Sequence, residues 1–91
     1  MANIRIKRTH RLGLDNARSE VEKLARTLKT DLQADYQWKG NKLLFKRSGA
    51  SGTIDVGGDY IDLDIKLGLL LSPMKGKIED NINQKLDAAL S

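Results

Sequence analysis

The most regular alternation of apolar and polar positions in the chain runs from Tyr60 to Leu67. Its two faces would carry Ile61, Leu63, Ile65 and Leu67 against Asp62, Asp64 and Lys66. A period of two is typical of a strand with one buried face and one face in water. The stretch therefore predicts a half-buried strand in a sheet with one wet face.

The alternation ends at Gly68, and Leu69, Leu70 and Leu71 follow as an unbroken apolar run. Two interpretations stay open. The run is either a corner that the two predicted helices cover completely, or a patch that is partly exposed. On a small protein an exposed apolar patch usually marks an interaction surface.

Shorter alternating stretches predict four more strands, at residues 3–9, Tyr36–Trp38, Leu43–Lys46 and Thr53–Val56. Lys39-Gly40-Asn41 is expected as a turn and Ser48–Gly52 as a loop. The pair Gly57-Gly58 is the strongest hairpin signal in the chain, because both positions tolerate positive φ.

Apolar residues at helical spacing predict a first helix from Asn16 to about Ala34, with Asp15 as its N-cap. Its apolar positions fall within about 100° of arc and form a single core-facing stripe. Glu22 and Arg26 make a favourable i,i+4 pair on the opposite, solvated side. The stripe consists of Ala17, Val21, Leu24, Ala25, Leu28 and Leu32.

Ser72 and Pro73 predict the start of a second helix, because serine suits the N-cap and proline suits the first helical position. One face of this helix would carry an apolar stripe of Met74, Ile78, Ile82, Leu86 and Ala89. Lys85 falls inside the stripe, where its methylene groups can cover apolar neighbours while the ammonium reaches water.

The order of elements is β-α-β-β-β-β-α, in a single domain over residues 1–91. It predicts an α+β fold, with two helices on one face of a five-stranded antiparallel sheet of order 2-3-4-5-1. The first strand would lie antiparallel to the strand Tyr60–Leu67. That pairing would set Arg5 and Lys7 near Asp62 and Asp64, where opposite charges across strands are modestly favourable.

The net charge of +4 raises the possibility of nucleic-acid binding, but its distribution favours internal pairing. The basic residues gather in the first strand and the acidic ones in the last. The alternative is a nucleic-acid-binding module with anion contacts from the N-terminal strand and the third predicted strand. Its residues would be Arg5, Lys7, Arg8, His10, Arg11, Lys46 and Arg47.

Few residues of this chain offer catalytic or metal chemistry, so we expect no enzyme, no cofactor and no metal. There is no cysteine and His10 is the one histidine, which argues against thiolate sites, zinc sites and catalytic triads. Alternate carboxylates on a flat strand do not converge as a hard cation requires, which argues against a site at Asp55, Asp59, Asp62 and Asp64. A third possibility is a small ligand in a crevice near Trp38 and His10.

Several short motifs, taken in order, resemble the polyhydroxyalkanoic acid system proteins, small bacterial proteins whose genes tend to lie near those for polyhydroxyalkanoate synthesis. The resemblance covers essentially the full length. The motifs are His10 to Gly13, Ala17-Arg18, Trp38, Gly40, Leu43, Phe45, Gly49, Gly52, Leu67-Gly68 and Ile78-Glu79.

This resemblance implies a bacterial protein associated with storage-polymer granules, and it supplies no catalytic residues. The strand order also resembles a reduced helix-grip fold. We expect a cytoplasmic, non-enzymatic module that has no transmembrane segment. It would bind a granule surface or a granule-associated protein, and a homo-oligomer is a further option. The contact would be made by Leu69, Leu70, Leu71, Met74 and Ile78.

Overall fold

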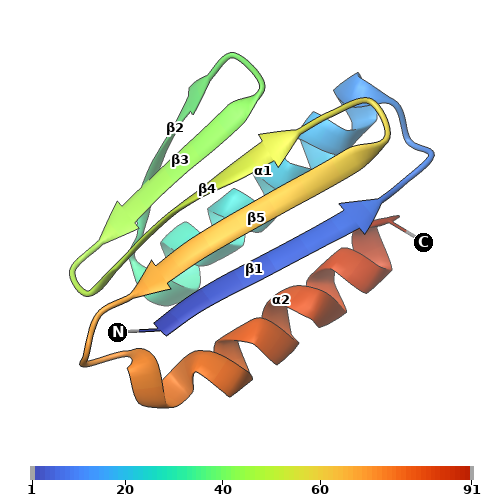
Figure 1. Cartoon of the computed structure of the whole chain (residues 1–91). Coiled ribbons are helices and arrows are strands. Elements are labelled where there is room, and N and C mark those ends of the chain that lie inside the picture. The colour runs from blue at the N-terminus through green and yellow to red at the C-terminus, as the bar shows by residue number, and fades with distance from the viewer. Residues whose placement is uncertain (1, 91) are drawn as a thin grey trace.

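The computed structural model describes residues 2–90; positions 1 and 91 and the side chains of Asp31 and Leu32 lie outside this description. Five strands, two α-helices and one short 3₁₀ helix follow one another along the chain (Figure 1). They are β1 (Ala2–Thr9), α1 (Leu14–Leu32), β2 (Asp35–Lys39), β3 (Lys42–Arg47), β4 (Ala50–Val56), β5 (Tyr60–Leu67), η1 (Ser72–Met74) and α2 (Lys75–Leu90).

The strands form one antiparallel sheet of order β1-β5-β4-β3-β2, which confirms the predicted topology. The register sets Arg5 opposite Asp64 and Lys7 opposite Asp62. No ion pair joins these two strands among the described side chains. The Lys7 ammonium instead lies 5.9 Å from the centre of the Tyr60 ring. Strand pairing is therefore set by the backbone and the buried face rather than by closed salt bridges.

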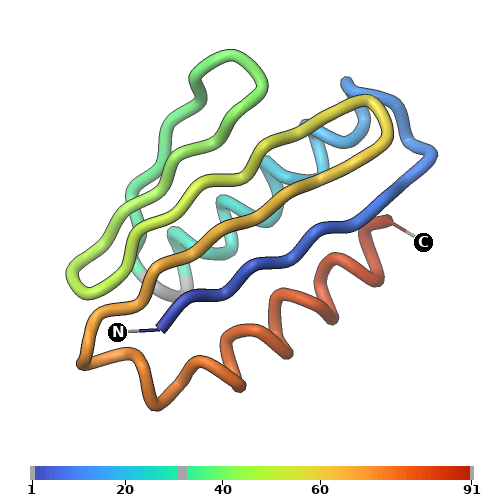
Figure 2. The backbone as a smooth tube through the Cα atoms, in the orientation of Figure 1, coloured from blue at the N-terminus to red at the C-terminus, as the bar shows by residue number. Residues whose placement is uncertain are grey.

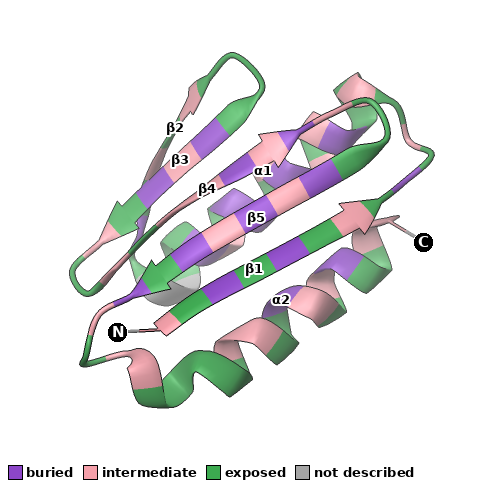
Figure 3. Cartoon of the chain, viewed as in Figure 1, coloured by how far each residue is buried: buried purple, intermediate pink, exposed green. Residues whose placement is uncertain are grey.

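The core lies between one face of the sheet and the two helices. Buried residues alternate with more exposed ones along β1 and β5, as the period of two requires (Figure 3). Helix α1 crosses behind the sheet, whereas α2 runs beside β1 (Figure 1). The largest fully buried side chains are Ile4, Val21, Leu43, Ile54, Ile61 and Leu63.

Both ends of α1 differ from the prediction. The helix begins at Leu14, and its N-cap is Gly13 with φ 79° and no side-chain cap bond. Asp15 was therefore wrong as the N-cap, although it lies in the first turn, where a carboxylate favours the helix dipole. The helix ends at Leu32, and Gln33 follows in the left-handed region with φ 57°.

The start of α2 also differs from the prediction. Ser72 opens the short helix η1, and its hydroxyl donates to the carbonyl oxygen of Gly68 at 2.9 Å instead of capping a helix N–H. The α-helix proper begins at Lys75. Figure 2 shows the chain leaving β5 near the start of β1 and turning back along β1 as α2. In the predicted stripe Ile82 and Leu86 are buried, whereas Met74 is 42% exposed.

Two connections are tighter or differently built than predicted. The expected loop Ser48–Gly52 is a short turn, with Gly49 at φ 86°, and β4 starts already at Ala50. Gly57 and Gly58 do connect β4 to β5, but neither adopts positive φ. The Tyr60 ring occupies the space that a Cβ at position 57 would take, so a larger residue there would require this ring to shift.

Candidate functional site

The connection between β5 and α2 carries the most exposed apolar side chains of the described chain. Leu69 and Leu70 are each 81% exposed and Met74 is 42% exposed. We call residues 68–74 the leucine corner. Leu71 turns inward and packs beside Gly49, and Ile78 is half-buried against the core. Of the two open interpretations, the structure therefore supports partial exposure of the run.

The backbone of the leucine corner is fixed by hydrogen bonds. The Gly68 N–H donates to the carbonyl oxygen of Gly49 at 2.7 Å, which ties the corner to the β3–β4 turn. The Gly68 carbonyl oxygen accepts from the Leu71 N–H at 3.2 Å and from the Ser72 N–H at 3.0 Å. Leu69 and Leu70 thus project from a backbone that is hydrogen-bonded on both sides of them.

Exposed basic side chains lie on both sides of the leucine corner in the sequence. Lys75 and Lys77 are exposed in the first turn of α2, and Lys66 is exposed at the end of β5. Long amine side chains next to exposed leucines can lay their methylene groups on an apolar surface while the ammonium stays in water. The leucine corner therefore combines an apolar tip, made by Leu69 and Leu70, with exposed ammonium groups beside it.

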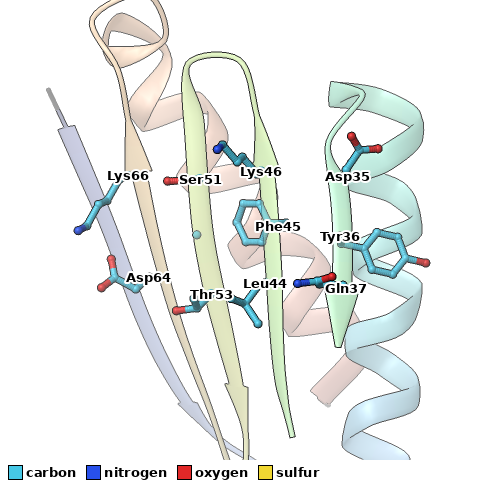
Figure 4. A pocket seen from close by; sticks show the side chains of 11 residues that line it. Asp35, Tyr36, Gln37, Leu44, Phe45, Lys46, Ser51, Thr53, Asp64 and Lys66 are labelled. Atoms are coloured by element: carbon cyan, nitrogen blue, oxygen red, sulfur yellow. The ribbon is translucent and has the colours of Figure 1, made fainter. Parts of the chain in front are cut away.

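The wet face of the sheet holds an open groove of about 550 Å³. Figure 4 shows its polar side chains in two rows across the strands. The strand register places one row at Gln37, Leu44, Thr53 and Asp64 and the other at Asp35, Lys46, Ser51 and Lys66. One carboxylate oxygen of Asp64 is buried without a hydrogen-bond partner, although Arg5 lies opposite Asp64 across the strands.

His10 is 6% exposed and both of its ring nitrogens contact the backbone. Nδ1 accepts a hydrogen bond from the Leu12 N–H at 3.2 Å. The neutral ring therefore carries its proton on Nε2, which lies 3.2 Å from the carbonyl oxygens of both Gly57 and Tyr60. His10 thus ties the end of β1 to the β4–β5 connection and presents no free ring nitrogen to a ligand.

Glu22 on α1 joins the helix to β2. Its carboxylate accepts hydrogen bonds from the Tyr36 hydroxyl at 2.5 Å, the Trp38 indole N–H at 3.0 Å and the Arg26 guanidinium at 3.0 Å. These bonds, that from Tyr36 first, lower the pKa of Glu22, and the same carboxylate raises the pKa of Tyr36. The Arg18 guanidinium lies 4.7 Å from the centre of the Trp38 ring.

The basic residues of the alternative anion site lie in different surroundings. Arg5 and Lys7 face the wet side of the sheet, whereas Arg8 turns to α2, where it pairs with Asp87 at 2.6 Å and Asn83 at 3.0 Å. Arg11 is exposed in the connection after β1. The structure therefore does not bring the N-terminal basic set onto one face.

A second groove of about 310 Å³ lies between the two helices, with Ile61 of the sheet among its lining residues. Lys23 and Lys85 line it together with leucine and alanine side chains. Neither Trp38 nor His10 lines this groove or the one on the wet face. The prediction placed both residues beside a ligand crevice. In the structure His10 instead binds a backbone carbonyl oxygen, and Trp38 donates to Glu22.

Two absences in the described part of the chain bear on the candidate chemistry. No group of three or more histidine, cysteine, aspartate or glutamate side chains could hold a metal ion there. Neither described helix is long and apolar enough to cross a membrane.

The Glu22 cluster is the arrangement that sequence reasoning missed. Glu22 was assigned to a solvated helix face, and its predicted pair with Arg26 is confirmed. The available signal was that Tyr36 and Trp38 share one face of β2, directly after the helix. Buried tyrosine and tryptophan donors usually find a hydrogen-bond acceptor, and here Glu22 on the covering helix is that acceptor.

The comparisons with known proteins identify a family and no nearer relative. The family model described as "Putative polyhydroxyalkanoic acid system protein" matches residues 4–90. No curated protein and no solved structure matches the chain. The helix-grip resemblance thus stays a prediction. Because the match takes in both helices and every strand of the sheet, the chain belongs to the polyhydroxyalkanoic acid system protein family.

Proposed function

We propose that this protein is a non-catalytic module that attaches to the hydrophobic surface of polyhydroxyalkanoate storage granules through the leucine corner. The observation that carries the proposal is the 81% exposure of both Leu69 and Leu70. The family of this chain connects it to the polyhydroxyalkanoate system. The polyhydroxyalkanoate polymer offers an apolar surface for exposed leucine side chains. The engagement of both ring nitrogens of His10 supports a role without catalysis.

The size of the apolar tip predicts weak and reversible attachment. Burying one leucine side chain is worth about 1.5–3 kcal/mol, so two would supply about 3–6 kcal/mol. A binding free energy of about 4 kcal/mol corresponds to a dissociation constant near 1 mM. Contacts from Met74 and from the ammonium groups of Lys75 and Lys77 would add to this binding free energy. The corner can therefore hold the protein at a surface without ordering any new segment.

The test is co-sedimentation with protein-free polyhydroxyalkanoate particles, comparing the natural chain with Leu69→Asp/Leu70→Asp. We expect the double variant to lose at least about tenfold of its binding, because two charged groups replace the apolar tip. The matched control is Ser19→Asp/Gln84→Asp, which adds the same charge on exposed positions of α1 and α2. The control should bind as the natural chain does.

Two results would overturn the proposal. Equal binding of the natural chain and Leu69→Asp/Leu70→Asp would show that the leucine corner is not the contact. Binding to native granules that disappears after protease treatment of the granules, with no binding to protein-free particles, would identify a granule-associated protein as the partner instead of the polymer surface.

A further inference from the structure

We propose that a second copy of this chain pairs along the open edge of β2, so that the two sheets become one continuous antiparallel sheet. The contact would be a two-fold arrangement centred on Gln37. It stands on observations at β2 alone and does not depend on the proposed granule attachment.

The strand β2 forms the open edge of the sheet. It pairs with β3 on one side and ends the strand order on the other. Figure 1 shows β2 at the margin of the sheet, where α1 contacts its Tyr36 and Trp38 side chains, whereas α2 runs beside β1 at the opposite edge. An edge strand presents unpaired backbone N–H and C=O groups and can template pairing with another strand.

The sequence of β2 carries some of the devices that limit edge pairing and lacks others. No proline interrupts Asp35–Lys39, and its exposure alternates regularly along all five residues. Natural sheets limit edge pairing with proline, bulges and inward-pointing charges, which β2 lacks, and with short strands and outward charges, which it has in its five-residue length and in Asp35 and Lys39. The strand is therefore geometrically ready to accept a partner strand.

One antiparallel register makes the edge complementary to itself. With Gln37 opposite Gln37 of the second copy, Asp35 lies opposite Lys39 at both ends of the contact. Tyr36 then lies opposite Trp38, so an opposite-charge pair and an aromatic pair each occur twice. Both kinds of pair stabilise neighbouring strands. A shift by two residues in either direction breaks the charge pairing.

The second copy would also relieve a like-charge contact within the chain. Lys39 lies directly opposite Lys42 across the β2–β3 hairpin, and Asp55, 3.7 Å from the Lys42 ammonium, offsets the repulsion from the Lys42 side only. An Asp35 carboxylate from the second copy would lie on the other side of Lys39 and offset that repulsion. The aromatic side chains are already ordered by hydrogen bonds to Glu22, so less side-chain freedom is lost on association.

Such a dimer would carry two leucine corners. Two attachment points on one particle make the second binding event intramolecular, which raises the overall affinity when the geometry permits both contacts. This would compensate for the weak binding that a single apolar tip provides.

Sedimentation equilibrium over a range of protein concentrations tests the pairing. We expect reversible dimerisation of the natural chain. Asp35→Lys and Lys39→Asp each place like charges opposite one another twice, and each should weaken dimerisation by about tenfold or more. The combined variant Asp35→Lys/Lys39→Asp restores opposite charges and should restore the dimer. Ser19→Lys/Gln84→Lys, on exposed positions of α1 and α2, changes the net charge by the same +2 as Asp35→Lys and should dimerise normally.

Gln37→Lys is an independent variant, because it sets two ammonium groups against each other on the two-fold axis. Circular dichroism and Trp38 fluorescence establish that each variant is folded. A natural chain that stays monomeric at millimolar concentration would overturn the proposal. So would a dimer that survives Gln37→Lys, or one that the double swap fails to restore. Leu69→Asp/Leu70→Asp should remain dimeric even when granule binding is lost, which separates the two proposals.

Discussion

The two ends of β5 are built on opposite principles. At its start, His10 is buried and uses its side chain to bind the backbone of the β4–β5 connection. At its end, the leucine corner is held by backbone hydrogen bonds and directs Leu69 and Leu70 into solvent. The His10 side chain stabilises the fold at the start of β5, whereas the Leu69 and Leu70 side chains stay exposed at its end. Exposure and hydrogen bonding, rather than residue type, therefore separate a structural from a functional candidate.

The largest expected effect on stability lies at the His10 end. His10→Ala removes the donor to two carbonyl oxygens and the acceptor of the Leu12 N–H. Because buried polar groups without partners cost about 1–3 kcal/mol each, we expect the free energy of unfolding to fall by about 2–4 kcal/mol. Urea denaturation measures this change.

The same variant also probes the leucine corner. Binding of folded His10→Ala to polymer particles should match that of the natural chain, because the two connections lie at opposite ends of β5. A loss of binding without unfolding would contradict this separation of roles.

A smaller loss of stability is expected at Glu22, whose side chain, like that of His10, forms hydrogen bonds to another segment of the chain. Because its pKa is lowered in the fold, its contribution to stability is present above its ordinary pKa and is lost as the pH falls through the folded value. Glu22→Gln should reduce the free energy of unfolding by about 1–2 kcal/mol at neutral pH. The difference from the natural chain should shrink as the medium becomes acidic.

Denaturation at a series of pH values measures this effect. Glu20→Gln is a suitable control, since Glu20 pairs with Lys23 on the surface of the same helix. An equal loss at every pH for Glu22→Gln would show that the carboxylate charge is not what stabilises the contact with Tyr36 and Trp38.

The strands of the fold could be predicted from the sequence more closely than the ends of its helices. The period of two located β5, and charge and topology together placed β1 antiparallel beside it, with Arg5 and Lys7 on the side of Asp62 and Asp64, as observed. The helix ends were misplaced because the caps depend on backbone conformation, as at Gly13 with φ 79°, and not on the nearest capping side chain. The Ser72 hydroxyl donates to the Gly68 carbonyl oxygen instead of capping a helix, and the pattern of residues along the chain does not reveal this contact.

The candidate site was predictable only in part. The apolar run from Leu69 to Leu71 was visible in the sequence, but its exposure was not. Leu71 packs beside Gly49 because the corner is tied to the β3–β4 turn, a contact between segments far apart in the chain. The role of Glu22 likewise depends on which helix face covers β2. Such long-range pairings are set by the assembled sheet.

The most direct test of the account compares neighbouring leucines that differ in exposure. Leu69→Ala/Leu70→Ala and Leu71→Ala are each measured for binding to protein-free polymer particles and for the free energy of unfolding. The account predicts that the exposed pair loses binding while its stability changes by less than about 0.5 kcal/mol. Leu71→Ala should lose about 1–2 kcal/mol of stability and keep its binding. Binding that falls with Leu71→Ala and persists in the double variant would contradict the account.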